Sequence, residues 1–421
     1  MEEWKEYKLG DVCSRLRSGK GIKADSVFNS GKYPVIGGNG VRGYADVPNF
    51  EGQAAIIGRQ GAYCGNVRFF EGEAYMTEHA VVAVGNELAD TRFLACLLSL
   101  MHLGNLSAQS AQPGISVQTL SKQPIRLPSI SYQKKVSAII KSLDDKIEVN
   151  RRINDNLEQQ AQALFKSWFV DFEPFRDQPF VESELGMIPE GWRIYSMDEL
   201  VDVIGGYSYK GEELKESQTA MATIKNFERD GGFKTTGFKE IIPSPKVKPE
   251  QFLSKFDIMI AHTDLTQNAD IIGNPALLLS FGNYKKLIMS MDLVKTKPKN
   301  DAISFGLLYS IFADTRFKSH ALGYVNGTTV LHLSKKAIPE YRISLPDNLN
   351  ELALYESIFD SIFRKESEMM DESRRLAELR DTLLPRLMSG ELSVDGLKGQ
   401  FAVSPGRCPG SNEHVSNKTA L

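Results

Sequence analysis

The chain has 421 residues, of which 42% are hydrophobic and 24% charged, as expected for a globular protein of two or three domains. A formal net charge of −3 argues against a uniformly basic nucleic-acid-binding protein, although local basic faces remain compatible with it. The N-terminal residues show no signal-peptide pattern, no apolar stretch could span a membrane, and four dispersed cysteines argue against a zinc site, so we expect a cytoplasmic protein.

The first half of the chain recurs, loosely, in the second half, which indicates a duplicated domain. The matched segments are Trp4-x-x-Tyr7 with Trp192-x-x-Tyr195, Gly65-Asn66 with Gly273-Asn274, residues 76–82 with 289–295, residues 114–122 with 327–335, and Leu127-Pro128 with Leu345-Pro346. Their shared order argues against chance, and their growing separation indicates insertions in surface loops of the second copy. Two similar halves suit a target with two separated halves, of which DNA is the commonest. The sequence therefore predicts globular domains at residues 1–128 and 190–346.

Two glycine-rich loops in the first domain are candidate contacts with such a target. The second loop follows the apolar strand pattern at residues 54–57, and its glycines permit close backbone approach. Arg, Lys, Asn and Gln read base edges, while Lys, Arg and backbone N–H groups hold phosphates. The candidates are Asn39, Arg42, Arg59, Gln60 and Tyr63. For any one of them, turn chemistry or a solvated surface is an equally good explanation.

A long helix is predicted after the first domain, within residues 129–172, because the chain has neither Gly nor Pro from Gln133 to Phe169. Apolar residues alternate there at spacings of four and three, the pattern of a coiled-coil seam with a polar pair in its middle. A helix of about 37 residues is roughly 55 Å long, and a turn of DNA is roughly 34–36 Å. The helix could therefore serve as a spacer that holds two DNA-reading domains at a fixed separation. An ordinary helical hairpin is the alternative. The seam comprises Val136, Ile140, Leu143, Ile147, Asn150, Asn154, Leu157, Leu164 and Trp168.

After a linker at residues 173–189, the second domain offers its own polar loops. One loop follows the strand pattern at residues 257–260, which matches that at 54–57, but it lacks an Arg. His79 and His262 stand singly and are interpreted as core or surface residues. The candidate contacts are Lys210, Lys225, Asn226, Lys234, Thr263, Thr266, Gln267 and Asn268.

A second long helix is predicted within residues 347–397, and Pro385 is expected to end or kink it near Leu384. We expect the two helices to pack antiparallel, with polar seam residues fixing their register. The tail at 398–421 has a composition typical of disorder. The second seam comprises Tyr355, Phe359, Ile362, Met369, Leu376 and Leu383.

Motifs that carry chemistry are not found, so we predict no catalytic and no metal-binding residues. The segment Asn274-Pro275-Ala276 fails as the motif of an amino-methyltransferase. Gly19-Lys20-Gly21 lacks the remainder of a phosphate-binding loop. Glu213-Leu214-Lys215 resembles the end of a nuclease site, but such tripeptides are common by chance.

Residues 150–175 resemble the central conserved region of the specificity (S) subunit of type I restriction–modification systems, and residues 383–392 resemble its C-terminal conserved region. Glu190-Gly191-Trp192 and the repeated Leu-Pro stop resemble the borders of its target-recognition domains. The resemblance covers roughly Trp4 to Leu397, and the tail departs from it.

The resemblance implies a mixed α/β fold in which a pair of antiparallel coiled-coil helices separates two target-recognition domains. It implies a non-catalytic subunit that reads a bipartite double-stranded DNA target and recruits two methyltransferase (M) subunits and restriction (R) subunits. Those partners, rather than this chain, would use S-adenosylmethionine, ATP and Mg²⁺. A coiled-coil scaffold with two protein-binding domains and no DNA role is the alternative, favoured by the acidic net charge. An autonomous enzyme is disfavoured by the missing motifs.

Overall fold

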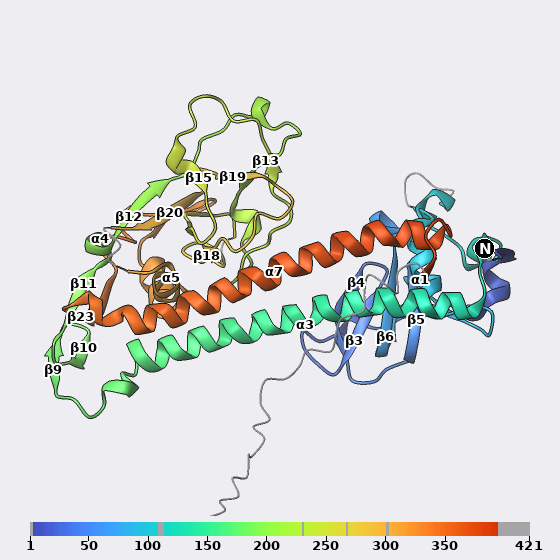
Figure 1. The fold of residues 1–421 in the computed structure, drawn as a ribbon, viewed down its shortest axis with the longest axis horizontal. Helices are drawn as coiled ribbons and strands as arrows, with labels where there is room; N and C mark the ends of the chain where they lie inside the picture. Colours follow the sequence, from blue (N-terminus) through green and yellow to red (C-terminus); the bar gives the residue numbers. More distant parts are fainter. Residues whose placement is uncertain (1–2, 108–112, 230, 267, 300–302, 395–421) are drawn as a thin grey trace, which may run out of the picture. The chain divides into compact units, whose positions relative to one another are not determined.

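The computed structural model describes residues 3–107, 113–229, 231–266, 268–299 and 303–394, which form two compact units. The first unit comprises Met1–Asp144 with Glu378–Leu421, and the second comprises Asp145–Ala377. Each unit contains a mixed α/β domain and a portion of both long helices (Figure 1). The predicted mixed α/β class with two long helices is confirmed, whereas the predicted domain boundaries remain predictions.

The domain of the first unit is built on a sheet with the strand order β2-β7-β5-β6-β3-β4. Neighbouring strands are antiparallel except β3 and β6, and a separate strand pair, β1 with β8, joins the start of the domain to its end. Helix α1 packs on this sheet through its buried apolar side chains. The bounds are β1 Lys5–Lys8, β2 Cys13–Ser18, β3 Tyr33–Gly37, β4 Gly40–Ala45, β5 Phe50–Gly58, β6 Val67–Met76, β7 Ala80–Gly85, α1 Thr91–Leu100, α2 Val117–Ser121 and β8 Pro124–Leu127.

The second unit divides its strands among several smaller sheets, with the orders β12-β20-β16-β18, β14-β13-β19-β15 and β17-β22-β21, and the pairs β9 with β10 and β11 with β23. The bounds of its strands are β9 Phe180–Ser183, β10 Gly186–Pro189, β11 Trp192–Ser196, β12 Val201–Gly205, β13 Thr219–Ala222, β14 Lys239–Glu240, β15 Phe252–Leu253, β16 Ile258–Ala261, β17 Thr263–Asp264, β18 Pro275–Leu277, β19 Lys286–Met289, β20 Leu293–Pro298, β21 Val325–Asn326, β22 Leu331–Leu333 and β23 Arg342–Pro346. Its short helices are α4 Met197–Leu200, α5 Phe305–Ala313 and α6 Thr315–Leu322.

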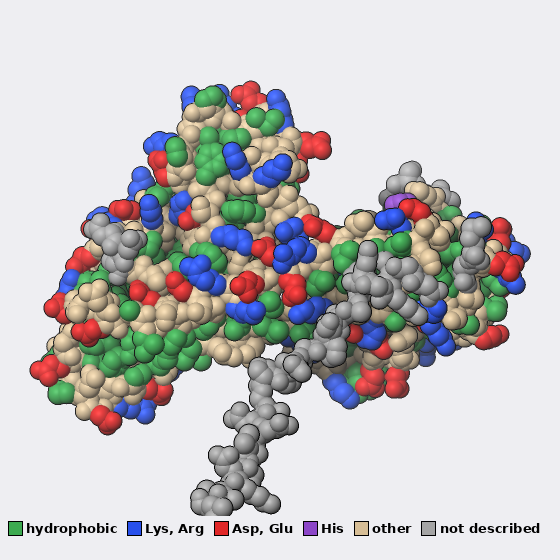
Figure 2. Space-filling model, in the orientation of Figure 1, with side chains coloured by type: hydrophobic (Ala, Val, Ile, Leu, Met, Phe, Trp, Pro, Cys, Tyr) green, Lys and Arg blue, Asp and Glu red, His purple; other side chains and the backbone are tan. Residues whose placement is uncertain are grey.

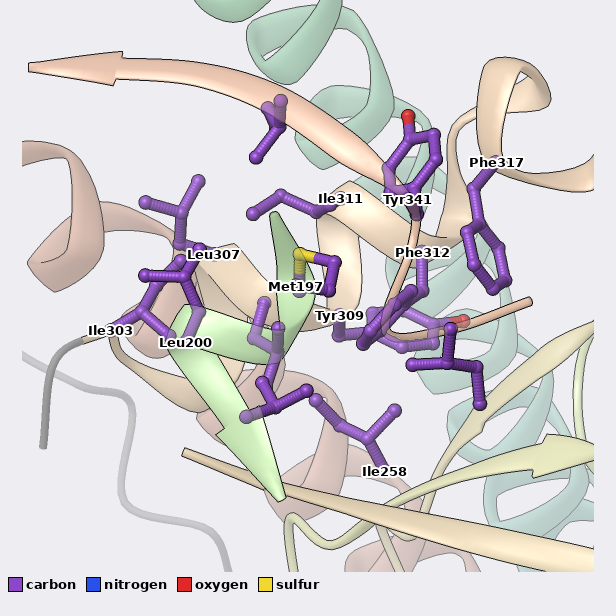
Figure 3. Packing of buried hydrophobic residues seen from close by; sticks show 14 of the residues in the cluster. Met197, Leu200, Ile258, Ile303, Leu307, Tyr309, Ile311, Phe312, Phe317 and Tyr341 are labelled. Atoms are coloured by element: carbon purple, nitrogen blue, oxygen red, sulfur yellow. The ribbon is translucent and has the colours of Figure 1, made fainter. Parts of the chain in front are cut away.

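The core of the second unit forms where α4, α5 and α6 meet β11, β16 and β23. Helix α5 is apolar on nearly all sides, and all but its two terminal residues are buried, so it lies inside this core. Figure 3 shows Met197 and Leu200 of α4 facing Leu307 and Ile311 of α5. This packing supports the strands that lead to the loops described below.

The two units repeat one hydrogen-bonded framework, as the sequence repeat predicts. The strand pair that closes each domain sets Tyr7 opposite Ile125 in the first unit and Tyr195 opposite Ile343 in the second. The Trp-x-x-Tyr and Leu-Pro segments of the repeat therefore occupy equivalent places in the two units.

A second element of the framework is a backbone hydrogen bond that crosses each domain. The N–H of Gly19 donates to the carbonyl of Ala80 at 3.1 Å, and the N–H of Gly206 donates to that of Leu293 at 3.1 Å. The segments that begin at Met76 and Met289 are thus equivalent, as the sequence match predicts.

One match of the sequence repeat is wrong in register. The N–H of Ile115 donates to the carbonyl of Arg59 at 3.0 Å, and the N–H of Leu333 donates to that of His262 at 2.9 Å. The counterpart of Ile115 is therefore Leu333, whereas the match of residues 114–122 with 327–335 would pair Ile115 with Thr328. The extra residues of the second copy lie before this contact, and the spacing of Gly327, Leu333 and Ser334 imitates that of Gly114, Leu120 and Ser121 without structural equivalence.

Two long antiparallel helices, α3 (Ile130–Phe169) and α7 (Ala353–Met388), run through both units. In the first unit the hydroxyl of Tyr132 donates to the carbonyl of Leu387 at 3.3 Å, and Arg380 Nη1 donates to Asp144 Oδ1 at 2.9 Å. Residues further along α3 thus contact residues nearer the start of α7, so the two helices are antiparallel. None of the helices in the described ranges combines the length and apolar character that a membrane crossing requires.

The same antiparallel pairing continues within the second unit. The rings of Trp168 and Tyr355 meet edge to face at 5.0 Å, and Asn150 Nδ2 donates to Glu372 Oε2 at 2.8 Å. Among the predicted seam residues, those classed as buried are Val136, Ile140, Leu143, Asn150, Phe359 and Leu383, and those classed as half-buried are Ile147, Asn154, Leu157, Leu164, Trp168, Tyr355, Ile362, Met369 and Leu376.

Pro385 does not end α7 near Leu384, so that part of the prediction is wrong, while a kink there stays a prediction. The helix continues to Met388, and the N–H of Ser389 still donates to the carbonyl of Pro385 at 2.9 Å. Proline removes one N–H donor. In the last turn, the missing hydrogen bond costs less free energy than the burial of Leu387 and Met388 contributes.

Candidate nucleic-acid interface

Three loops of the first unit converge where β3, β5 and β6 end. The N–H of Arg59, just after β5, donates to the carbonyl of His79, in the turn between β6 and β7, at 3.0 Å. The side chains of Gln60 and His79 also meet, with 3.0 Å between Oε1 and Nδ1. The turn after β3 packs closely against both loops. A Cβ on Gly38 of this turn would lie only 3.0 Å from the His79 carbonyl and 3.2 Å from Gly58 Cα. The structure thus brings two predicted candidates, Arg59 and Gln60, onto one surface.

Arg59 is fixed by its backbone on both sides, since its N–H is bonded to His79 and its carbonyl accepts from Ile115. This fixes the direction in which its half-buried side chain leaves the strand. Its Nη1 lies 3.5 Å from the hydroxyl of Ser18. This partner is a hydroxyl and not a carboxylate, so the guanidinium can also donate hydrogen bonds to an anionic or acceptor-rich ligand.

The other candidates of the first unit lie on neighbouring exposed segments. Asn39, in the turn between β3 and β4, accepts a hydrogen bond at 3.3 Å from Nη2 of Arg68 on β6, a guanidinium that the sequence did not single out. Arg42 is exposed on β4, and the side chain of Tyr63 is half exposed beside the end of β5. Donors and an aromatic ring therefore surround the Arg59 loop.

In the second unit, the corresponding loop folds around a buried carboxylate. Asp264 accepts hydrogen bonds from the N–H groups of Thr266 at 2.7 Å, Ile271 at 2.7 Å and Ile272 at 3.0 Å. Burial alone would raise the pKa of Asp264, but these hydrogen bonds outweigh it and lower that pKa. The carboxylate therefore acts as a fixed centre for the loop.

Lys318 of α6 fastens the same loop from the other side. Its Nζ donates to the carbonyls of Ile272 at 2.6 Å and Ala269 at 3.1 Å, and to Asn274 Oδ1 at 2.7 Å. Burial lowers the pKa of the Lys318 ammonium. The loop is thus held between a buried anion and a half-buried cation, so its shape is determined before any ligand binds.

Asn226 is buried, and its amide is occupied by the backbone of its own loop. Its Nδ2 donates to the carbonyls of Lys234 at 3.1 Å and Thr236 at 3.0 Å, and its Oδ1 accepts from the N–H of Thr223 at 3.0 Å. In this structure Asn226 shapes the loop that presents Lys225 and Lys234.

The remaining candidates of the second unit differ in exposure. Lys210, Lys225, Lys234 and Asn268 are exposed, Thr266 is half-buried, Thr263 is buried, and Gln267 lies outside the described residues. Lys210 and Lys234 pair with Glu212 at 3.8 Å and Glu228 at 3.3 Å. Figure 2 shows Lys and Arg interspersed with Asp and Glu on the visible face rather than gathered into one basic surface.

Sequence reasoning missed His262, which occupies in the second unit the place that Arg59 occupies in the first. Burial, followed by the electrostatic influence of His332 and Lys335, lowers the pKa of His262. The missed signal was its position directly after the matched apolar strand. Within the described ranges, His, Cys, Asp and Glu form no group of three or more suited to a metal ion.

Comparisons with known proteins agree on one family. Residues 1–159 match the family described as "Type I restriction modification DNA specificity domain". The chain is 36% identical to the EcoprrI specificity subunit of Escherichia coli over 34% of this chain and 36% of that protein, so this match spans less than two thirds of the relative. It is 26% identical to the HindI specificity subunit of Haemophilus influenzae over 93% of this chain and 100% of that protein.

The fold is also known from a solved structure. The S subunit of a type I restriction–modification system from M. genitalium superposes with a TM-score of 0.52 at 17% identity, covering 92% of this chain and 96% of that one. This likeness concerns the fold alone. In sequence, residues 1–159 match the type I specificity-domain family, and the chain is similar over nearly its whole length to a type I restriction enzyme specificity subunit.

Proposed function

We propose that this chain is the non-catalytic specificity subunit of a type I restriction–modification complex and recognises a bipartite double-stranded DNA target. The observation that carries the proposal is one hydrogen-bonded framework built twice, with different side chains on equivalent loops. A repeated framework presents two readers, and different loops give them different preferences. The complex would act on DNA in the cytoplasm.

The helices α3 and α7 would serve as the spacer between the two readers and as the site where two M subunits dock. The arginines at positions 151, 152 and 375 are exposed on these helices and offer polar surface for such partners. R subunits would join the complex to cleave DNA. S-adenosylmethionine, ATP and Mg²⁺ would be bound by the M and R subunits, where the chemistry takes place.

A methylome tests the proposal directly. The chain is co-expressed with its M subunit in a host that lacks other DNA methylation, and modified bases are mapped by single-molecule sequencing. N6-methyladenine confined to one bipartite motif, and present only with this chain, is the expected result. A soluble complex that leaves the genome unmethylated, or methylation by M alone with the same pattern, would contradict the proposal.

A further inference from the structure

We propose that one set of equivalent positions determines the base preference of each half of the DNA target. The set consists of Arg59, Gln60 and His79 in the first unit and of His262, Thr263 and Asp292 in the second. The inference rests on the proposed function and deepens it by naming the residues that distinguish the two half-sites.

The first argument is that the backbone places these residues identically. The N–H of Arg59 donates to the carbonyl of His79 at 3.0 Å, and the N–H of His262 donates to that of Asp292 at 2.8 Å. Each bond joins the residue after a buried strand, β5 or β16, to the turn that precedes its antiparallel neighbour in the sheet, β7 or β20. His262 therefore leaves its strand where Arg59 leaves the corresponding strand.

The second argument is that the loop returns to the framework at the same point in both units. The N–H of Gly65 donates to the carbonyl of Gly58, and the N–H of Gly273 donates to that of Ala261, both at 2.8 Å. The two glycines share the left-handed conformation, with φ values of 83° and 78°. The loops differ in length between these fixed points, but their entry and exit are the same.

The third argument is that a side-chain contact also recurs. Gln60 Oε1 lies 3.0 Å from His79 Nδ1 in the first unit, and the hydroxyl of Thr263 donates to Asp292 Oδ1 at 3.2 Å in the second. The same pair of positions is thus coupled in both units, but an amide with an imidazole has been replaced by a hydroxyl with a carboxylate.

Exposure divides the roles within each set. Gln60 is exposed, and Arg59 and His79 are half-buried. Thr263, with 7% of its surface exposed, is instead a positioning residue that orients Asp292. His262 and Asp292, both half-buried, are left to approach a ligand in the second unit.

The chemistry of the two sets predicts different preferences. A guanidinium only donates hydrogen bonds and suits the O6 and N7 acceptors of guanine, whereas a carboxylate accepts and suits the amino group of cytosine. Arg59 and Asp292 therefore present opposite hydrogen-bonding character at related places. The second unit adds His332 and Lys335 near His262, which suit a DNA phosphate beside the base contact.

The test places the residues of the first set at the equivalent positions of the second unit, within the methyltransferase complex. The triple variant H262R/T263Q/D292H is mapped by methylome beside the wild type and the control K336A, whose exposed lysine faces Glu340. We expect the first half of the motif to remain unchanged, and discrimination at one or more positions of the second half to change about tenfold or more.

A triple variant that does not co-purify with M is replaced by H262Q and D292N, which preserve the backbone framework. A wild-type complex that methylates a bipartite motif, with the second half intact in the folded variants, overturns this inference alone. A second-half change of the same kind in K336A also overturns it. A wild-type complex without any bipartite motif instead overturns the proposed function.

Discussion

Individual residues of the framework act through backbone geometry, and the glycines show this most directly. Gly61 and Gly65 both lie in the left-handed region, with φ values of 78° and 83°. A Cβ on Gly61 would meet no atom within 4 Å, whereas one on Gly65 would lie 2.0 Å from the backbone nitrogen of Gly104. The two positions therefore separate conformational strain from steric exclusion.

We expect G61A to lower the free energy of unfolding by roughly 1 kcal/mol, the cost of a left-handed alanine. G65A should cost clearly more, because the backbone at Gly104 must also move. Thermal denaturation of the two variants and the wild type measures both values. Equal destabilisation by the two variants would show that the close contact at Gly65 is unimportant.

Lys318 is a second residue whose role can be isolated. K318M keeps the length of the side chain but leaves the carbonyls of residues 269 and 272 without their donor, so we expect a loss of about 1–3 kcal/mol. Hydrogen exchange should accelerate within residues 264–274. K336M is the control, because Lys336 is exposed, and it should leave exchange in this loop unchanged.

At the scale of elements, the helical seam contains an acidic residue that is buried rather than solvated. Glu366 of α7 is 5% exposed, and within the described ranges its Oε1 has no hydrogen-bond partner. Burial, followed by repulsion from Glu158 of α3, raises its pKa to about 8. The folded protein therefore binds the proton of the Glu366 carboxyl group more tightly than the unfolded chain does.

A raised pKa in the folded state means that stability is highest below the unfolded value of 4.5 and declines as the pH rises through about 8. E366Q removes the charge at nearly constant shape. We expect it to match the wild type near pH 5 and to be more stable above pH 8, by on the order of 1–3 kcal/mol. Thermal denaturation across this range measures the difference.

The matched control is E368Q, since Glu368 is exposed two residues further along the same helix. The difference in free energy of unfolding between E368Q and the wild type should stay constant across this pH range. A constant offset between E366Q and the wild type at all pH values would contradict the predicted proton uptake.

The elements themselves were largely predictable, because periodicity reports burial over many residues. The long helices follow from repeated apolar spacing, and the closing strands follow from the matched Leu-Pro segments. The end of α7 was not predictable from Pro385, since the cost of a missing donor depends on burial of Leu387 by distant residues. Likewise, Asn226 looks like a surface amide in sequence, but its partners are backbone atoms that only the fold brings near.

Loop residues were harder to predict than elements for the same reason. His262 was dismissed because its neighbours in sequence include no catalytic or metal partner. Its significance comes from hydrogen bonds to Asp292 and Leu333, which are distant along the chain. The match of residues 257–260 with 54–57 places His262 opposite Arg59, but only the structure shows that the two residues make equivalent backbone hydrogen bonds.

For the whole molecule, the doubled framework predicts that the two readers can be exchanged separately. Replacing residues 1–128 with those of another family member should change one half of the methylated motif and preserve the other half and the gap. Methylome mapping of the chimaera with the M subunit is the measurement. A chimaera that alters both halves would contradict independent reading by two domains.

The framework that joins Arg59 to His79 and His262 to Asp292 is made of main-chain N–H and carbonyl groups. Every amino acid except proline supplies both groups, so almost any substitution at these positions leaves the bonds in place. At the positions proposed to read DNA, side chains can therefore change while these backbone bonds are kept. Under the proposed function, a scaffold of this kind would let a few point mutations change the DNA target while the fold is retained.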